Sequence, residues 1–564
     1  MIFLIVPGTG QANQAIQPAL GGAIYSALWG AVGVGLLVIL CLHYKIRPGT
    51  AVLAALMYAL TTSIWVDASV AEIVTMTMAL TLGSLLAAIQ FSRTGEQKTL
   101  FWLALLSSQA VLHQRALVFL APGLALLVWR QRAVVWRSLP MIGAVFALGF
   151  LVYLYLPIRA WMGADWTFNA PGTWDGFWAI VLDTKTERIV DIPQDAFNLL
   201  GRWQGVVDIL RHDWPWPLLV TGLLGLGLVG KRQNWLEAAA LTLIWLPFLI
   251  LSIVIWEGRV ADALLATNLP LYPMAALGLA LLTTWVYERF RSAGLVGHFL
   301  WLMLLGYLFI QHRPIVLEVT RDPGAIQVVA KAQQVEPPAD GSPLTMMALW
   351  GRDYWALTYA QAYEDTLTGL TLVDHNADLG AILEQEGRLL TLSDTFYLRP
   401  LSWWQERYGQ LYLSSVAPGV VELSTRPRTD PSPFSQTPTS LGNGITVLET
   451  QVTHPTTDTV QLTVYWQADE PTTTDYSVAV HLVTTFPPTG PQDILAQADK
   501  AHPVEGWYPT SLWQSGEIVR DSYLIAVPEG STPYGLSLGM YYTAADGQFV
   551  NSERVLILLD LARD

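Results

Sequence analysis

Two carboxylic acids five residues apart lie between two apolar segments of the chain. Asp67 and Glu72 belong to a short turn that separates Ala51–Val66 from Ile73–Phe91. A carboxylate in such a turn can take the proton of an acceptor hydroxyl as a general base, or bind a divalent metal. A solvated turn between two helices would contain the same residue types. The sequence makes Asp67 and Glu72 weak catalytic candidates and leaves the solvated turn open.

Polar residues interrupt one further apolar stretch, and an arginine ends another. His113, Gln114 and Arg115 divide Leu100–Trp129, and polar groups between two short membrane helices are costly unless they face a cavity or a partner. We therefore predict that His113 and Arg115 bind substrate. Arg159 follows the motif YLYLP, where a guanidinium can bind a phosphate through two hydrogen bonds. The alternative for this arginine is extension towards lipid phosphates.

Arg259, in the motif WEGR, is a further candidate for substrate binding. Its alternative is an ion pair with Glu257, two residues earlier. The sequence contains no glycine-rich nucleotide loop, zinc-ligand spacing or nucleophile elbow. A reaction with a soluble nucleotide is therefore not indicated, and no metal ligands are assigned.

The composition is that of a membrane protein with a soluble part attached. Of the 564 residues, 52% are hydrophobic and only 13% are charged. Residues 1–314 carry about 19 basic and 15 acidic side chains, whereas residues 315–564 carry about 12 and 30. Residues 315–564 are strongly acidic, which argues against nucleic acid as a partner. Because Cys41 is the single cysteine, no disulfide within the chain can form.

Apolar runs predict a polytopic helical domain of about ten helices, since a helix needs about 20 apolar residues to cross the hydrocarbon. The stretch Leu100–Trp129 would be about 45 Å long as one helix, so we expect two short helices that meet at His113–Arg115. The other predicted spans are Leu20–Leu42, Ala51–Val66, Ile73–Phe91, Leu139–Leu156, Trp216–Val229, Trp235–Trp256, Ala266–Tyr287 and Leu295–Ile310.

The distribution of basic residues predicts the orientation of these helices. A basic cluster follows every second span, which places all the clusters on the cytoplasmic side by the positive-inside rule. The N-terminus, the candidate residues named above and everything after Gln311 then fall on the outer face of a plasma membrane. The clusters are Lys45/Arg47, Arg93/Lys98, Arg130/Arg132/Arg137, Lys231/Arg232 and Arg289/Arg291.

One outer segment has the periodicity of an amphipathic helix. Residues Asp195–His212 place five apolar side chains at helical spacing, which predicts a helix on the outer membrane surface. The five are Phe197, Leu200, Trp203, Val207 and Leu210. The tryptophans that flank this helix indicate an aromatic belt at the interface, although one or two could stack on a sugar ring. They are Trp161, Trp166, Trp174, Trp178, Trp214 and Trp216.

The remainder of the chain alternates strand-like and helical patterns and then becomes all-β. We predict a membrane domain over residues 1–312, an exported α/β domain over 313–425, a Pro- and Thr-rich linker over 426–440 and a β-sandwich over 441–564. In the α/β part, strand-like LTMMALW, LTGLTLVDH and LLTLSD alternate with helices near Tyr354–Tyr363 and Asp378–Glu386.

The motifs at the candidate residues resemble a known family. The segments WVDASVAEIVTM, LHQRALVFLAPGLALL, YLYLPIRA and DWTFNAPGTWDGF resemble a bacterial membrane family described as protein O-mannosyltransferase-like. Glu72, His113 and Arg159 match positions of its pattern, and Gln114-Arg115 departs from it. The resemblance covers roughly residues 5–290.

The resemblance implies a GT-C, lipid-linked-sugar glycosyltransferase fold. Such enzymes transfer a hexose, with inversion, from a polyprenyl phosphate to a glycan, lipid or protein acceptor outside the bacterial plasma membrane. The family carries its catalytic acid in a loop after the first helix, and Met1 aligns with the end of that loop. The expected base would then lie upstream of Met1. The alternatives are a non-catalytic scaffold or glycan-binding protein derived from that fold, and, third, a transporter.

Overall fold

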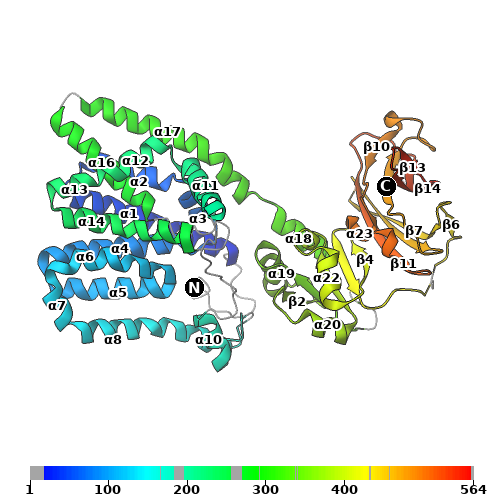
Figure 1. Cartoon of the computed structure of the whole chain (residues 1–564), viewed down its shortest axis with the longest axis horizontal. Coiled ribbons are helices and arrows are strands. Elements are labelled where there is room, and N and C mark those ends of the chain that lie inside the picture. Colours follow the sequence, from blue (N-terminus) through cyan, green and yellow to red (C-terminus); the bar gives the residue numbers. More distant parts are fainter. Residues whose placement is uncertain are drawn as a thin grey trace. The chain divides into compact units, whose positions relative to one another are not determined.

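The computed structural model describes residues 18–164, 167–182, 196–255, 270–290, 293–336, 338, 341–430, 434–456 and 458–559. The chain forms two compact units, Met1–Asp322 and Pro323–Asp564. The first unit is helical and apolar. The second is rich in β-sheet, so the predicted order of a membrane domain followed by α/β and β parts is found (Figure 1).

The first unit is built from long helices and from shorter pieces that continue one another. Its elements are α1 (Pro18–His43), α2 (Pro48–Ala59), α3 (Thr62–Ser69), α4 (Val74–Thr94), α5 (Gln97–His113), η2 (Arg115–Leu120), α6 (Ala121–Val128), η3 (Trp129–Gln131), α7 (Arg132–Arg137), α8 (Leu139–Gly149), η4 (Phe150–Leu154), α9 (Tyr155–Trp161), α10 (Trp174–Leu182), α11 (Ala196–Asp213), α12 (Trp216–Gly225), α13 (Gly227–Arg232), α14 (Trp235–Ile250), η5 (Leu251–Ile255), α16 (Leu271–Arg289) and α17 (Ala293–Thr320). Figure 1 shows α4, α5 and α8 following one another across the unit.

The chain is a multi-pass membrane protein. Among the described residues, six helices are long and apolar enough to span a membrane, or seven if the bent pair α2–α3 is one span. Three more helical segments, α5, α12–α13 and α16, coincide with predicted spans but are not among these six or seven. The predicted break at Gln114 is confirmed, because α5 ends at His113 and Gln114 is extended, with φ −142° and ψ 115°.

The predicted basic clusters meet at one end of the first unit, which we call the basic end. Arg93 is 3.1 Å from Glu237, and the Tyr44 hydroxyl donates to the same carboxylate at 2.7 Å. Arg232 pairs with Glu288 on the neighbouring helix. Successive helices therefore run in opposite directions, which returns the chain to the basic end after every second helix.

Glycines bring two helices of this unit into backbone contact. A Cβ added to Gly278 of α16 would lie 1.8 Å from the carbonyl oxygen of Gly222 in α12. One turn along, a Cβ on Gly225 would lie 2.2 Å from the carbonyl of Gly278. Small residues at such spacing are typical of membrane helices that pack backbone to backbone.

We expect Gly278→Val to separate α12 from α16 and to destabilise the helical unit by about 1–3 kcal/mol, the usual cost of overpacking. The single thiol, Cys41, is fully buried in this unit, so its reaction with a thiol-reactive dye during heating reports unfolding. Gly306→Val is the matched control, because no atom lies within 4 Å of a Cβ at Gly306. Equal melting temperatures for the two variants would contradict the close contact.

The second unit begins with a sheet covered by helices on both faces. Its elements are α18 (Gly324–Gln333), β1 (Thr345–Ala348), α19 (Arg352–Tyr363), β2 (Thr371–Asp374), α20 (Leu379–Glu386), β3 (Arg388–Leu392), α21 (Thr395–Leu398), α22 (Leu401–Tyr408), β4 (Tyr412–Ala417) and β5 (Val420–Ser424). The strand order is β2-β1-β3-β5-β4, with β1 parallel to β2 and β3. The three predicted strands and the two predicted helices between them are all present.

Two antiparallel sheets form the rest of the second unit. One contains β10 (Ile494–Gln497), β9 (Ser477–Val483), β12 (Gly535–Thr543), β13 (Phe549–Asn551) and β14 (Val555–Leu558); the other contains β11 (Ile518–Ala526), β8 (Thr459–Ala468), β7 (Ile445–Thr456) and β6 (Thr439–Ser440). Alternate residues of β8, β9 and β12 point into one apolar cluster, which also includes Trp404 and Leu413 of the α/β part. The predicted linker, residues 426–440, thus ends in the short strand β6.

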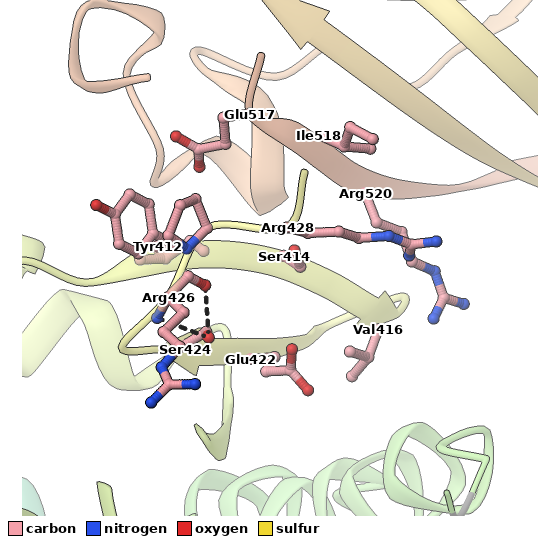
Figure 2. Close-up of a pocket in the computed structure, with 12 residues that line it drawn as sticks. Tyr412, Ser414, Val416, Glu422, Ser424, Arg426, Arg428, Glu517, Ile518 and Arg520 are labelled. Atoms are coloured by element: carbon pink, nitrogen blue, oxygen red, sulfur yellow. Dashed lines mark hydrogen bonds between the residues drawn. The ribbon is translucent and has the colours of Figure 1, made fainter. Parts of the chain in front are cut away.

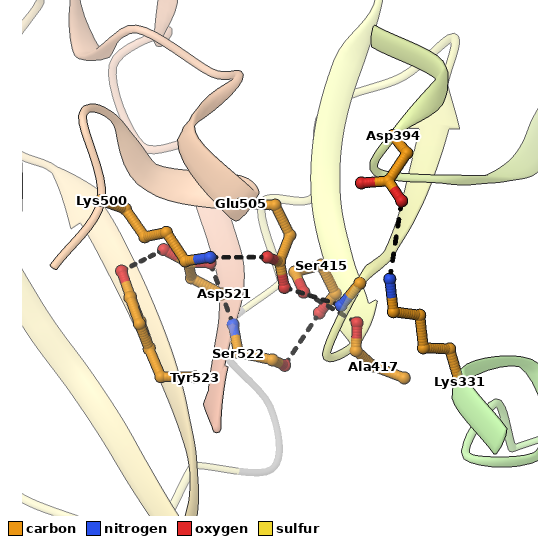
Figure 3. A network of polar contacts seen from close by, with 10 residues as sticks. Lys331, Asp394, Ser415, Ala417, Lys500, Glu505, Asp521, Ser522 and Tyr523 are labelled. Carbon is orange, nitrogen blue, oxygen red and sulfur yellow. Dashed lines mark hydrogen bonds and ion pairs between the residues drawn. The ribbon is translucent and has the colours of Figure 1, made fainter. Parts of the chain in front are cut away.

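Buried polar groups join the α/β part to the β part (Figure 3). The Glu505 carboxylate accepts from the Gly419 amide at 2.8 Å and pairs with Lys500 at 3.0 Å. The Ser522 hydroxyl donates to the Ser415 carbonyl of β4 at 3.3 Å. Beside it, the carboxyl group of Asp521 is fully buried, and this burial raises its pKa to about 7.

The raised pKa of Asp521 predicts a pH-dependent stability. Between about pH 4 and pH 7 the folded state holds a proton that the unfolded state has released, so the free energy of unfolding falls as pH rises through this interval. The loss is about 1.4 kcal/mol for each pH unit in the interval. We expect Asp521→Asn to remove much of this dependence and to stabilise the second unit at pH values above the interval.

This expectation can be measured on the full chain in detergent by pulse proteolysis across a urea series at several pH values. The control is Glu529→Gln, which neutralises an exposed carboxylate in the loop after β11. A pH profile unchanged by Asp521→Asn would assign the dependence to another group.

Candidate functional site

Asp67 lies near the end of α3 and Glu72 in the connection from α3 to α4, and the structure distinguishes between these two predicted catalytic candidates. Asp67 is only 6% exposed, and its Oδ2 atom has no hydrogen-bond partner within the described part of the chain. Glu72 is exposed, but Ser26 of α1 fixes its backbone through hydrogen bonds to the Glu72 carbonyl at 2.9 Å and from the Glu72 amide at 3.0 Å. The alternative interpretation, a solvated turn, fits the exposed Glu72 but not the buried Asp67.

The His113–Arg115 break lies against this connection. His113 Nε2 is 3.0 Å from the carbonyl of Ile73, the residue after Glu72. Gln114 Oε1 accepts from the Thr77 hydroxyl at 2.9 Å. The break and the carboxylates are therefore at the same end of the helical unit, opposite the basic end.

Arg115 has a partner that sequence reasoning did not identify. Its guanidinium donates to the carbonyl oxygens of Val181, at 2.5 Å, and Leu182, at 3.1 Å, which are the last residues of α10. A cation at a helix C-terminus satisfies free carbonyls and offsets the partial negative charge of that end. Arg115 thus positions α10, and substrate binding by Arg115 stays a prediction.

Arg159 is in the last turn of α9 and is half-buried. In the described residues no hydrogen bond or ion pair of its side chain is formed, so its donors remain available for an anion. The neighbouring Trp161 donates through Nε1 to the Gly172 carbonyl at 2.9 Å and is 71% exposed. Arg259 and Glu257 lie outside the described residues.

The predicted amphipathic helix is present as α11. Leu200 and Trp203 are 52% and 47% exposed, whereas Val206 and Leu210 are buried. Val206 and Leu210 belong to the apolar core of the helical unit, so one side of α11 packs against that unit. Trp214, assigned above to an interfacial belt, is fully buried as a consequence.

A buried carboxylate that the sequence did not single out holds this end of the unit together. Asp213, 2% exposed, accepts hydrogen bonds from the hydroxyls of Ser63 at 2.6 Å and Tyr272 at 2.5 Å. Trp214 Nε1 donates to the Thr61 hydroxyl at 2.9 Å, and His312 Nδ1 is 2.6 Å from the Leu60 carbonyl. We call these contacts the Asp213 clamp.

The Asp213 clamp surrounds a sharp break in the described part of the membrane unit. Helices α2 and α3 meet at 72°, at Leu60 and Thr61. A break at membrane depth frees backbone groups, and each must be satisfied from another element. The one hint in the sequence is that Asp213 ends an amphipathic helix directly before the predicted span Trp216–Val229.

The electrostatics of this end are dominated by carboxylates. The charges of Glu72 and Asp213 both act on Asp67, so three acids lie near the α3–α4 connection. Two tyrosines, Tyr58 and Tyr272, are buried beside them. Nowhere in the described ranges do three or more His, Cys, Asp or Glu side chains form a group that could hold a metal ion. The arrangement suits binding of hydroxyl groups and transfer of a proton to a carboxylate.

No protein-family model and no curated protein matches the chain. The crystal structure of ArnT from Cupriavidus metallidurans bound to undecaprenyl phosphate is similar, with 11% identity, a TM-score of 0.44 and coverage of 72% of this chain and 84% of that chain. ArnT in the apo state gives 12%, 0.42, 72% and 83%. A likeness of this size does not by itself establish a shared fold.

We expect Asp213→Ala to destabilise the helical unit by about 2–4 kcal/mol, because it leaves the buried Ser63 and Tyr272 hydroxyls without their acceptor. The Cys41 labelling assay during heating measures the change. Asp208→Ala, which removes an exposed carboxylate from the same helix, is the matched control. If both variants have the same melting temperature, the clamp does not stabilise the α2–α3 break.

Proposed function

We propose that this chain is a membrane glycosyltransferase that moves a sugar from a polyprenyl-phosphate donor to an acceptor hydroxyl on the outer face of a bacterial plasma membrane. One observation carries the proposal. The carboxylates Asp67 and Glu72 and the polar break at His113 lie together at the end of the membrane unit opposite its basic end. The sequence resemblance given above supports the same reaction class.

The proposed reaction is a single displacement at the anomeric carbon. The acceptor oxygen forms a bond to that carbon as the bond to the phosphate oxygen breaks, which inverts the configuration. Glu72 or Asp67 takes the acceptor proton, and Arg159 stabilises the charge that develops on the departing lipid phosphate. Asp67 suits the role of a base because it is buried and has an oxygen without a partner in the described residues. No step is assigned to a metal ion.

A non-catalytic scaffold or glycan-binding protein is the second candidate. It is favoured by the capping of α10 by Arg115, which uses one candidate binding residue to hold structure. The sugar, the acceptor and the exported location of the second unit belong to the proposal in either case. The two candidates differ in turnover, and donor binding alone does not separate them.

Transfer can be measured with full-length protein in proteoliposomes, a radiolabelled polyprenyl-phosphate hexose and candidate acceptors. We expect Glu72→Gln or Asp67→Asn to lower the rate by about 100-fold or more, the range for loss of a general base, while donor binding is kept. We expect Arg159→Ala to weaken binding of polyprenyl phosphate itself.

Arg137→Ala is the matched control for Arg159→Ala, because Arg137 is an exposed arginine of α7, in a basic cluster at the opposite end. Wild-type transfer in all three site variants would remove these residues from the mechanism. Donor binding without turnover in the wild type, with every acceptor offered, would favour the scaffold.

A further inference from the structure

A polar cavity lies within the second unit, between the β4–β5 hairpin, the segment after β5 and the start of β11 (Figure 2). Its volume is about 260 Å³. The membrane unit contributes no described residue to it, and nothing in the proposed transfer reaction uses it. The cavity residues with hydrogen-bonding or charged groups are Tyr412, Ser414, Glu422, Ser424, Arg426, Arg428, Glu517 and Arg520.

The alternation of side chains along β4 and β5 explains why polar residues line the hairpin side of the cavity. Ser414 pairs with Glu422, and Tyr412 pairs with Ser424, so these four side chains share one face of the hairpin. Intervening residues such as Leu423 point to the opposite face and are buried in the core. Since side chains alternate between the faces of a strand, the hairpin presents these four polar side chains to the cavity, next to Val416.

The concentration of arginine in this cavity is unusual for the unit that contains it. Pro323–Asp564 has 28 acidic and 11 basic residues, yet three of the 11 line this one cavity. They are Arg426, Arg428 and Arg520, and a fourth arginine, Arg388, acts on Glu422 from β3. Placing like charges together costs free energy unless an anion compensates them.

The cavity lining has two carboxyl groups against three arginines, so the carboxyl groups compensate the positive charge only in part. Glu517 is 2% exposed and accepts a hydrogen bond from the Tyr508 hydroxyl at 2.8 Å. Glu422 forms no hydrogen bond or ion pair in the described residues, although the surrounding arginines act on it electrostatically. Burial raises the pKa of both Glu422 and Glu517.

Two of the arginines are held in place with donors to spare. Arg428 lies over the rings of Phe434 and Tyr465, 5.5 and 5.2 Å from their centres, which orients the plane of its guanidinium. Arg520 projects from β11, and its Nε atom is buried with no hydrogen-bond partner in the described residues. Figure 2 shows both side chains extending towards the same end of the cavity.

We propose that this cavity binds a small polyhydroxylated anion, namely a sugar that bears a carboxylate or phosphate group. The arginines bind the anionic group, for which their planar donors are suited. The hydroxyls of Tyr412 and Ser414 bind the sugar hydroxyls, whereas the Ser424 hydroxyl is held by the backbone of Arg426. The volume is just under the usual range of about 300–1,000 Å³ for ligand pockets, which fits one sugar ring and not a chain.

The test is a titration of the full-length protein in detergent by calorimetry with four probes: glucuronate, glucose 6-phosphate, inorganic phosphate and glucose. We expect saturable binding of glucuronate or glucose 6-phosphate, with the tighter of the two identifying the source of the anion. We expect much weaker binding of inorganic phosphate, and none of glucose. Arg520→Gln should weaken binding of the sugar anion at least about tenfold, with partial rescue by Arg520→Lys.

Glu422→Gln provides the sharpest readout, because it removes a negative charge from the cavity. We expect it to strengthen binding of the sugar anion and to reduce the gain in affinity that the wild type shows as pH falls. A residue that only maintained the fold would not give opposite signs for Arg520→Gln and Glu422→Gln.

Arg352→Gln is the matched control, since it removes the same charge from α19, outside the cavity. The proposal is overturned if the wild type binds neither sugar anion saturably, or if Arg352→Gln weakens binding as much as Arg520→Gln. Loss of glycosyl transfer would leave these binding results unaffected, so the two proposals fail separately.

Discussion

The need to satisfy polar groups freed at the α2–α3 break organises the membrane unit. Leu60 and Thr61 interrupt a passage where lipid offers no hydrogen bonds, and their partners are His312 of α17 and Trp214, which directly follows α11. Asp213 is central because one carboxylate accepts from both Ser63 and Tyr272. Ser63 and Asp213, 150 residues apart in the chain, are thereby fixed next to each other. They lie beside α3, which contains Asp67, and the α3–α4 connection, which contains Glu72.

The same end of the unit shows how structural and chemical roles divide among similar residues. Arg115 donates to the end of α10, and His113 lies against the carbonyl of Ile73, so both hold elements in place. Glu72 has a fixed backbone and an exposed side chain, and Asp67 is buried with a free oxygen in the described part of the chain. Hydrogen bonds from other elements thus fix the backbone around the two acids.

The second unit is acidic, and it buries several charged groups without any disulfide bond. Glu505 is satisfied by Lys500 and the Gly419 amide, whereas Asp521 responds with a pKa raised to about 7. The cavity arginines lack an equivalent internal partner among the described residues. The contrast supports a role in binding for the cavity and a role in joining the two parts for the buried network.

Features that depend on local patterns could be predicted from the amino-acid sequence. Hydropathy and charge predicted the break at Gln114 and the gathering of basic clusters at one end, and periodicity predicted the strands and helices between residues 345 and 392. Which polar residues are buried, and by what, required the three-dimensional arrangement of the helices. The side of α11 that packs inward, the fully buried Trp214 and the Asp213 clamp depend on contacts between distant segments. Local patterns carry no information about such partners, because hydrogen bonding of Asp213 requires Ser63 and Tyr272 to arrive from other helices.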